Sequence, residues 1–157
     1  MKTKLTAALI TVAAIAGCTG TKTADDGATK TARHTASVNI NGKWEIECIM
    51  SDDSTYVRPA EETHGECNYF LFTDSTYSIS TNCNSLAGSY TLHGDSIALG
   101  DGMMTEMACD NMTTEDALRK TLPHIVKVDV ENDSIIRLNS SAGPAHIVLR
   151  RVASATE

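Results

Sequence analysis

Five cysteines carry the most definite chemistry in this chain of 157 residues. Cys18 directly follows an apolar leader, whereas Cys48, Cys67, Cys83 and Cys109 lie in the remaining sequence. An even number of cysteines in an exported protein predicts disulfide bonds, and four cysteines permit three pairings. We expect the local solution, Cys83 with Cys109 and Cys48 with Cys67, which closes two loops of about twenty residues. A zinc site is disfavoured because the short Cys-x-x-Cys spacing is missing.

Methionines around Cys109 are a second candidate group. Thioethers bind Cu(I), so a copper site is one interpretation of this cluster. Methionine also fills irregular gaps in protein cores, and we expect that role here, with no metal site and no cofactor. The four residues are Met103, Met104, Met107 and Met112.

The histidines show no spacing typical of catalysis. None forms a His-x-x-His or His-Glu-x-x-His pattern, and no nucleophile elbow, phosphate loop or dinucleotide fingerprint occurs. A cysteine nucleophile would conflict with the expected disulfides. We therefore expect no enzyme activity. The histidines are His34, His64, His93, His124 and His146.

The N-terminus has the layout of an export signal. Lys2 and Lys4 precede an apolar run over residues 5–16, which is too short to span a bilayer. Residues 15–18, Ile-Ala-Gly-Cys, resemble a bacterial lipobox, so we expect residues 1–17 to be removed and Cys18 to carry lipid, including palmitate. An ordinary signal peptide with an incidental cysteine is the alternative. Thr19 after the cysteine favours the outer membrane.

The charge of the mature chain excludes one class of partner. Without the leader and its two lysines, 11 basic residues face 20 acidic ones, a net charge of −9. Such a chain repels phosphate backbones, so nucleic-acid binding is not expected. Residues 18–37 are polar and lack apolar periodicity, which is typical of a solvated tether.

Short strands and turns dominate residues 38–152. Trp44, Ile46, Cys48 and Met50 alternate with mostly polar residues and predict one half-buried strand. Asp-Ser corners at positions 74, 95 and 133 separate strand-like runs, predicting hairpins between residues 90–92 and 97–99 and between residues 125–130 and 135–138.

One helix is expected after these first strands. Thr113 would cap it, with Asp116 three residues later, and the helix would end near Leu122, before Pro123. Five strands before the helix and three after it predict a mainly β, α+β fold. We expect a strongly curved antiparallel sheet or a partly closed barrel, covered by the helix.

Cys83-Asn84, then Gly88-x-Tyr90 and then Thr105-x-Met107-Ala108-Cys109 follow one another in the chain after Trp44. This ordered set resembles the META domain family, which includes HslJ-like heat-shock lipoproteins. The resemblance covers residues 39–151 and implies a META-like domain over residues 38–152, followed by a tail at 153–157. The family often has glycine where this chain has Asn82, which also tolerates a left-handed backbone. The matching residues are Trp44, Phe70, Phe72, Cys83, Asn84, Gly88, Tyr90, Thr105, Met107, Ala108, Cys109, Glu115 and Leu149.

The resemblance implies a role more than a reaction. Its members act in the cell envelope in stress tolerance, antibiotic resistance or virulence, without established catalysis. We expect a monomeric, lipid-anchored envelope protein, with an envelope protein as a possible partner. The alternative is a lipoprotein that binds a small ligand or copper, using an expected surface loop at residues 51–66, an expected loop at residues 100–104 or a groove under the helix. Core side chains including Trp44 and Leu122 are expected to fill that groove.

Overall fold

The computed structural model describes residues 38–59, 66–141 and 143–153. The expected leader, the tether and lipidated Cys18 therefore lie outside the described residues, as does part of the expected loop at residues 51–66. All described residues belong to one of two compact units, residues 34–157. Within this part of the chain, the helices are too short or too polar to cross a membrane.

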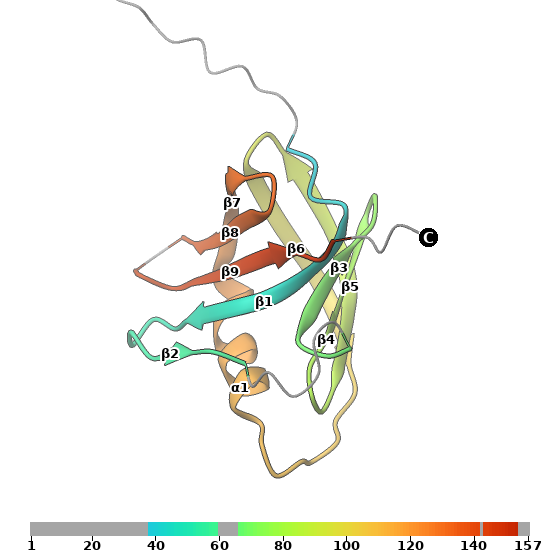
Figure 1. Cartoon of the computed structure of the whole chain (residues 1–157), viewed down its shortest axis with the longest axis vertical. Helices are drawn as coiled ribbons and strands as arrows, with labels where there is room; N and C mark the ends of the chain where they lie inside the picture. Colours follow the sequence, from blue (N-terminus) through green and yellow to red (C-terminus); the bar gives the residue numbers. More distant parts are fainter. Residues whose placement is uncertain (1–37, 60–65, 142, 154–157) are drawn as a thin grey trace, which may run out of the picture. The chain divides into compact units, whose positions relative to one another are not determined.

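Strands make up most of the described chain (Figure 1). The helix α1 (Thr113–Thr121) and a 3-10 turn, η1 (Leu122–His124), are inserted between the sixth and seventh strands. The strands are β1 (Gly42–Met50), β2 (Tyr56–Val57), β3 (Tyr69–Phe72), β4 (Thr76–Ser80), β5 (Ser85–His93), β6 (Ser96–Met104), β7 (Ile125–Asn132), β8 (Ile135–Ser140) and β9 (His146–Arg151).

The sheet closes on itself. Sequential strands from β3 to β9 pair antiparallel, and β1 pairs with β3 on one side and with β9 on the other. Only the short β2 stays outside this ring, beside the second half of β1. Closure removes exposed sheet edges. The predicted mainly β fold with a helix is confirmed, and the barrel alternative describes it better than the open curved sheet.

Around the barrel, strand pairing is least extensive between β6 and β7. Ser96 and Lys127 form the register pair that joins these two strands, supported by a bond of 2.8 Å from the Val128 amide to the Asp95 carbonyl. The rest of β6 is paired with β5. The chain between β6 and β7, with α1 in it, therefore covers a part of the barrel that strand pairing does not seal.

Alternating apolar side chains fill the interior. Trp44, Phe70 and Leu149 are at most 1% exposed, and every long strand contributes similar residues. Each such side chain contributes about 1.5–3 kcal/mol when it leaves water. The expected core role of Trp44, Phe70 and Phe72 is confirmed.

The predicted pattern of β1 is right in its first half and wrong in its second. The register with β9 shifts between Ile46 and Cys48, and Ile49 then pairs with Ile147. Ile49 is fully buried, whereas Met50 is only partly buried. A bulge reverses which residues face inward, so strict alternation from Trp44 to Met50 fails.

The predicted hairpins are confirmed. Tyr90 pairs with Leu99 and Leu92 with Ile97, and the β7–β8 pair likewise joins Val128 to Leu138. The segment expected as a loop at residues 100–104 is instead the end of β6.

The helix lies where it was predicted, but its cap differs. Thr113 is the first helical residue, and Met112 precedes it. The Thr113 backbone amide donates to Oδ1 of the Asn111 side chain at 3.1 Å. The predicted Thr113 cap is therefore wrong, because Met112 is the N-cap and makes no side-chain cap bond, and Asn111 satisfies only the first amide of the helix. Thr121 ends the helix, one residue before Leu122.

One of the two predicted disulfides is present. Cys83 and Cys109 are bonded across 26 residues, while Cys48 and Cys67 are free thiols, so the second predicted pair is wrong. Cys48 lies where β1 changes its neighbour from β3 to β2. The backbone before β3 turns at Asn68, with φ of 56°, which takes Cys67 out of line with the strand.

Thiol counting tests this arrangement. A Cys18→Ser chain, unfolded without reductant, is expected to expose two reactive thiols, those of Cys48 and Cys67. The same sample unfolded after reduction should give four thiols and serves as the control. Labelling followed by peptide mass mapping identifies the sites. A count of zero before reduction would restore the second predicted disulfide.

Candidate functional site

The corner between β4 and β5 positions Asn84. The Thr81 hydroxyl accepts the backbone amides of Cys83 at 3.1 Å and Asn84 at 2.8 Å. The Thr81 amide in turn bonds the Asn84 carbonyl. These bonds fix a tight turn, and the Asn84 side chain is held inside with only 2% of the residue exposed.

The Asn84 amide group bonds to the segment after β6. Its Oδ1 accepts the Thr105 hydroxyl and the Met107 amide, each at 2.8 Å. Its Nδ2 donates to the Met107 carbonyl at 2.9 Å and to Glu115 Oε2 at 2.8 Å. Both donors and both acceptor positions of the side chain are therefore used.

Glu115 is a carboxylate with no exposed surface. Its Oε1 accepts Arg119 Nε at 3.1 Å and Nη2 at 2.9 Å, one helical turn along α1. Burying a charge without partners would cost several kcal/mol, and the hydrogen bonds from Asn84 and Arg119 offset this cost at Glu115. We call Asn84, Thr105, Met107, Glu115 and Arg119 the Asn84 clasp.

Two independent restraints hold the connection from β6 to α1. The disulfide ties Cys109 to the residue before Asn84, and it contributes about 3 kcal/mol by restricting the unfolded chain. The Asn84 clasp adds directional bonds to the same segment and to the first turn of α1. The connection is therefore fixed over the weakly paired side of the barrel.

The other residues of the family motif serve the fold. Trp44 donates to the Ile40 carbonyl at 2.7 Å and stacks under the Arg151 guanidinium. Tyr90 donates to the Thr73 carbonyl at 2.6 Å. Ala108 is exposed, and Met107 is 58% exposed, so Met107 acts through its backbone and the predicted core packing is wrong.

Gly88 leaves room for an aromatic ring. It is the register partner of both Tyr77 on β4 and Gly102 on β6. A Cβ at Gly88 would approach the Tyr77 ring to 2.9 Å, and one at Gly102 would lie 3.2 Å from its hydroxyl. Tyr77 thus lies across two side-chain-free positions, where its hydroxyl donates weakly to the Gly100 carbonyl at 3.4 Å.

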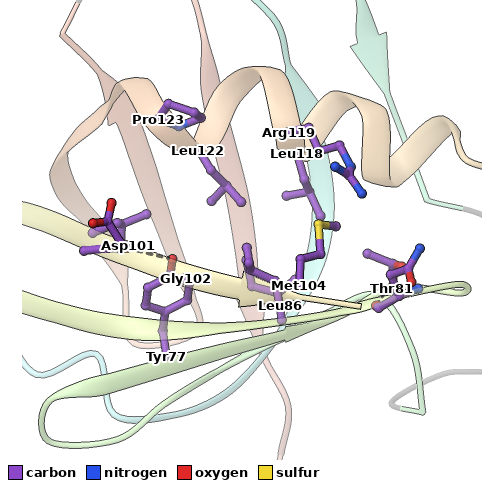
Figure 2. Close-up of a pocket in the computed structure, with 14 residues that line it drawn as sticks. Tyr77, Thr81, Leu86, Asp101, Gly102, Met104, Leu118, Arg119, Leu122 and Pro123 are labelled. Carbon is purple, nitrogen blue, oxygen red and sulfur yellow. Dashed lines mark hydrogen bonds between the residues drawn. The ribbon is translucent and has the colours of Figure 1, made fainter. Parts of the chain in front are cut away.

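A pocket of about 520 Å³ lies between α1 and strands β4, β5 and β6 (Figure 2). Leu118 of α1 and Leu122 of η1 line it on one side, and Leu86, Leu99 and Met104 line it from the strands. Its size is that of a typical small-molecule site. Leu122 was expected to fill this space as core; it does pack against the core, but it is only partly buried and also lines this open pocket.

Polar groups are placed at intervals around this pocket. Asn84 and Arg119 belong to the Asn84 clasp, while Tyr77 and Asp101 come from the strands. Burial, and secondarily the negative charge of Asp101, raises the pKa of the Tyr77 phenol. Tyr77 therefore remains a protonated hydrogen-bond donor at neutral pH.

The sequence did not reveal most of the pocket. Residues 100–104, which include Asp101, were named as a candidate binding segment and Leu122 was expected at the end of the helix, but Tyr77 and Arg119 were missed. The spacing of Glu115 and Arg119, four residues apart on a helix, was a usable signal for the ion pair. The contact between Tyr77 and Gly88 depends on strand register, which the sequence does not supply.

The remaining candidate ligands are dispersed. Met103 is 83% exposed, whereas its neighbour Met104 lines the pocket, so the two project from different faces of β6. His93, His124 and His146 lie on β5, η1 and β9. In the described part of the chain, no three His, Cys, Asp or Glu residues are grouped suitably for a metal ion. His34 and His64 lie outside it.

Comparison with known proteins identifies the domain. The META domain family matches residues 36–153. A protein from Burkholderia xenovorans, solved by NMR, is similar over 73% of this chain and 83% of its own, at 21% identity and a TM-score of 0.58. No curated protein matches the chain significantly.

Two crystal structures from Bacteroides are also similar. A DUF4847 family protein from Bacteroides vulgatus covers 71% of this chain and 93% of its own, at 11% identity and a TM-score of 0.49. A lipocalin-like protein from Bacteroides uniformis covers 71% and 97%, at 16% identity and a TM-score of 0.45.

The Asn84 clasp makes a direct prediction about stability. Asn84→Ala leaves Glu115 and the Met107 backbone short of buried partners, so we expect a loss of about 2–4 kcal/mol in the free energy of unfolding. Asn82→Ala is the matched control, because Asn82 is exposed and its side chain makes one bond, to the Asn111 carbonyl. Its loss should stay below about 1 kcal/mol. Equal losses in urea titrations of the two variants would contradict a stabilising clasp.

Proposed function

The chain belongs to the META domain family, and on that premise we propose that it is a non-catalytic binding protein of the cell envelope. A lipid on Cys18 anchors it to the outer membrane, and the pocket under α1 takes up a small, largely apolar ligand. Binding there serves envelope integrity under stress or antibiotic exposure. The pocket is the observation that carries this proposal.

The construction of the pocket supports ligand binding. Its walls come from two layers, α1 and the β4–β6 strands, that are fixed to each other by the Asn84 clasp and the disulfide. A rigid, preformed pocket loses little entropy when a ligand enters. Apolar side chains such as Leu86 and Leu118 supply contact area, while polar groups at the margin supply orientation.

The polar groups near the pocket favour binding over catalysis. Both oxygens of Glu115 are occupied by Asn84 and Arg119, so this carboxylate is not positioned to move a proton to or from a ligand. Cys83 and Cys109 are bonded to each other in a disulfide, so neither has a thiol that could act as a nucleophile. These residues therefore act as structure around a ligand site.

Membrane attachment is tested by replacing the lipidated residue. Cys18→Ser removes the thiol that would carry the lipid, so the protein should leave the membrane fraction and appear in the soluble envelope fraction. Cys67→Ser, at a free thiol, is the control and should stay with the membrane. Cells with only the Cys18→Ser protein should show the antibiotic sensitivity of a deletion strain. Retention of Cys18→Ser in the membrane would refute the lipid anchor.

Pocket binding is tested by filling the pocket. The neutral fluorescent probe N-phenyl-1-naphthylamine should bind with increased emission, and Leu122→Trp should weaken its binding about tenfold by occupying the space. Leu71→Trp places the same side chain on β3 away from the pocket lining and should leave binding unchanged. Both variants should keep the cooperative thermal unfolding of the parent. Equal affinities of the parent and Leu122→Trp would place the probe elsewhere.

A further inference from the structure

We propose that the pocket under α1 selects amphipathic ligands with a cationic end, using Asp101 as the counter-ion. The inference rests on the proposed function, because it assigns a chemical class to the ligand of the same pocket. Its argument comes from the charges that face the pocket and from the bulge that places one of them there.

Two charged residues line the pocket, and one of them is already neutralised. Arg119 donates twice to Glu115, so its positive charge is balanced by a buried carboxylate. Asp101, in contrast, belongs to none of the ion pairs among the described residues. The pocket therefore carries one uncompensated negative charge. A ligand cation would compensate it, whereas an anion would meet Arg119 only in competition with Glu115.

A bulge brings Asp101 to the pocket. Tyr90 pairs with Leu99, but Gly88 pairs with Gly102, so β6 has one residue more than β5 in this stretch. Bulges redirect side chains. Here both Leu99 and Gly102 line the pocket, and Asp101 between them lines it as well. Figure 2 shows Asp101 on β6 toward one end of the view and Arg119 on α1 toward the other.

Acceptors surround the expected position of the ligand cation. The Gly100 carbonyl, next to Asp101, accepts a weak 3.4 Å bond from the Tyr77 hydroxyl and, like every carbonyl, has two lone pairs. A protonated amine has several N–H donors and suits a carboxylate beside a carbonyl. A carboxylate end would find no such set of donors there. The leucines between Asp101 and Arg119 accommodate an alkyl body.

The net charge of the protein acts in the same direction. The mature chain carries a formal charge of −9, which raises the local concentration of cations and repels anions. This field is sequence-wide and screened by salt, whereas Asp101 acts at the pocket. The effect of net charge and the effect of Asp101 can be separated, because only the second is lost when Asp101 alone is replaced.

A matched set of ligands tests the inference. Octylamine, octanol and octanoate share one alkyl chain and differ in the charge of the end group, and each is titrated by calorimetry at low and high salt. Octylamine should bind up to about fivefold more tightly than octanol, since Asp101 is solvent-exposed, and octanoate should bind most weakly. Asp101→Asn should remove the preference, so that octylamine and octanol bind this variant with similar affinity. Asp110→Asn, the same charge change at an exposed position outside the pocket lining, should retain the preference.

The alternative outcomes separate the two proposals. If octanoate binds as tightly as octylamine, or if Asp101→Asn and Asp110→Asn reduce the preference equally, the assignment to Asp101 is overturned and the ligand pocket stands. If none of the three compounds binds the folded Asp101→Asn and parent proteins, both the ligand class and the pocket function are overturned.

Discussion

The hydrogen bond between the Asn84 amide and the buried Glu115 carboxylate is the interaction on which the rest of this domain depends. It joins the β4–β5 corner to α1, two segments 31 residues apart. A fully buried carboxylate is stable only with strong partners, so Glu115 requires both Asn84 and Arg119. The first turn of the helix is therefore tied to one place on the barrel. Thr105 and Met107 extend this restraint along the incoming chain.

This restraint matters because strand pairing does not complete the barrel evenly. The β6–β7 joint rests on the pair Ser96 and Lys127, so the distal part of β6 is paired only with β5, and it lines the pocket under α1. A helix packed only by apolar contacts could shift across such a gap. The Asn84 clasp gives it one position, and the disulfide at Cys83 and Cys109 limits the alternatives available to the unfolded chain. The gap becomes a pocket with defined walls.

Local chemistry was predictable from the sequence, and long-range register was not. Turn-forming residues mark hairpin corners locally, as Gly94 does with φ of 64° just before Ser96, so hairpins such as this one were found correctly. The disulfide of Cys83 followed from counting cysteines, but Cys48 failed because the bulge and the change of neighbour in β1 are tertiary features. The contact of Tyr77 with Gly88 has the same origin. A groove under the helix was considered from the sequence but was expected to be filled by core, because an open pocket arises only where separate elements meet.

The same physical constraint that builds the pocket also determines its chemistry. The buried Glu115 carboxylate requires the guanidinium of Arg119, which lines the pocket, so a ligand anion would have to compete with Glu115 for that positive charge. Asp101 lies outside this network, because the bulge in β6 places it at the pocket without an ion-pair partner among the described residues. Because Glu115 balances the charge of Arg119, Asp101 is the residue that selects the charge of the ligand. A META domain with an intact Asn84 clasp but a different residue at the position of Asp101 would keep this fold and bind a different class of ligand.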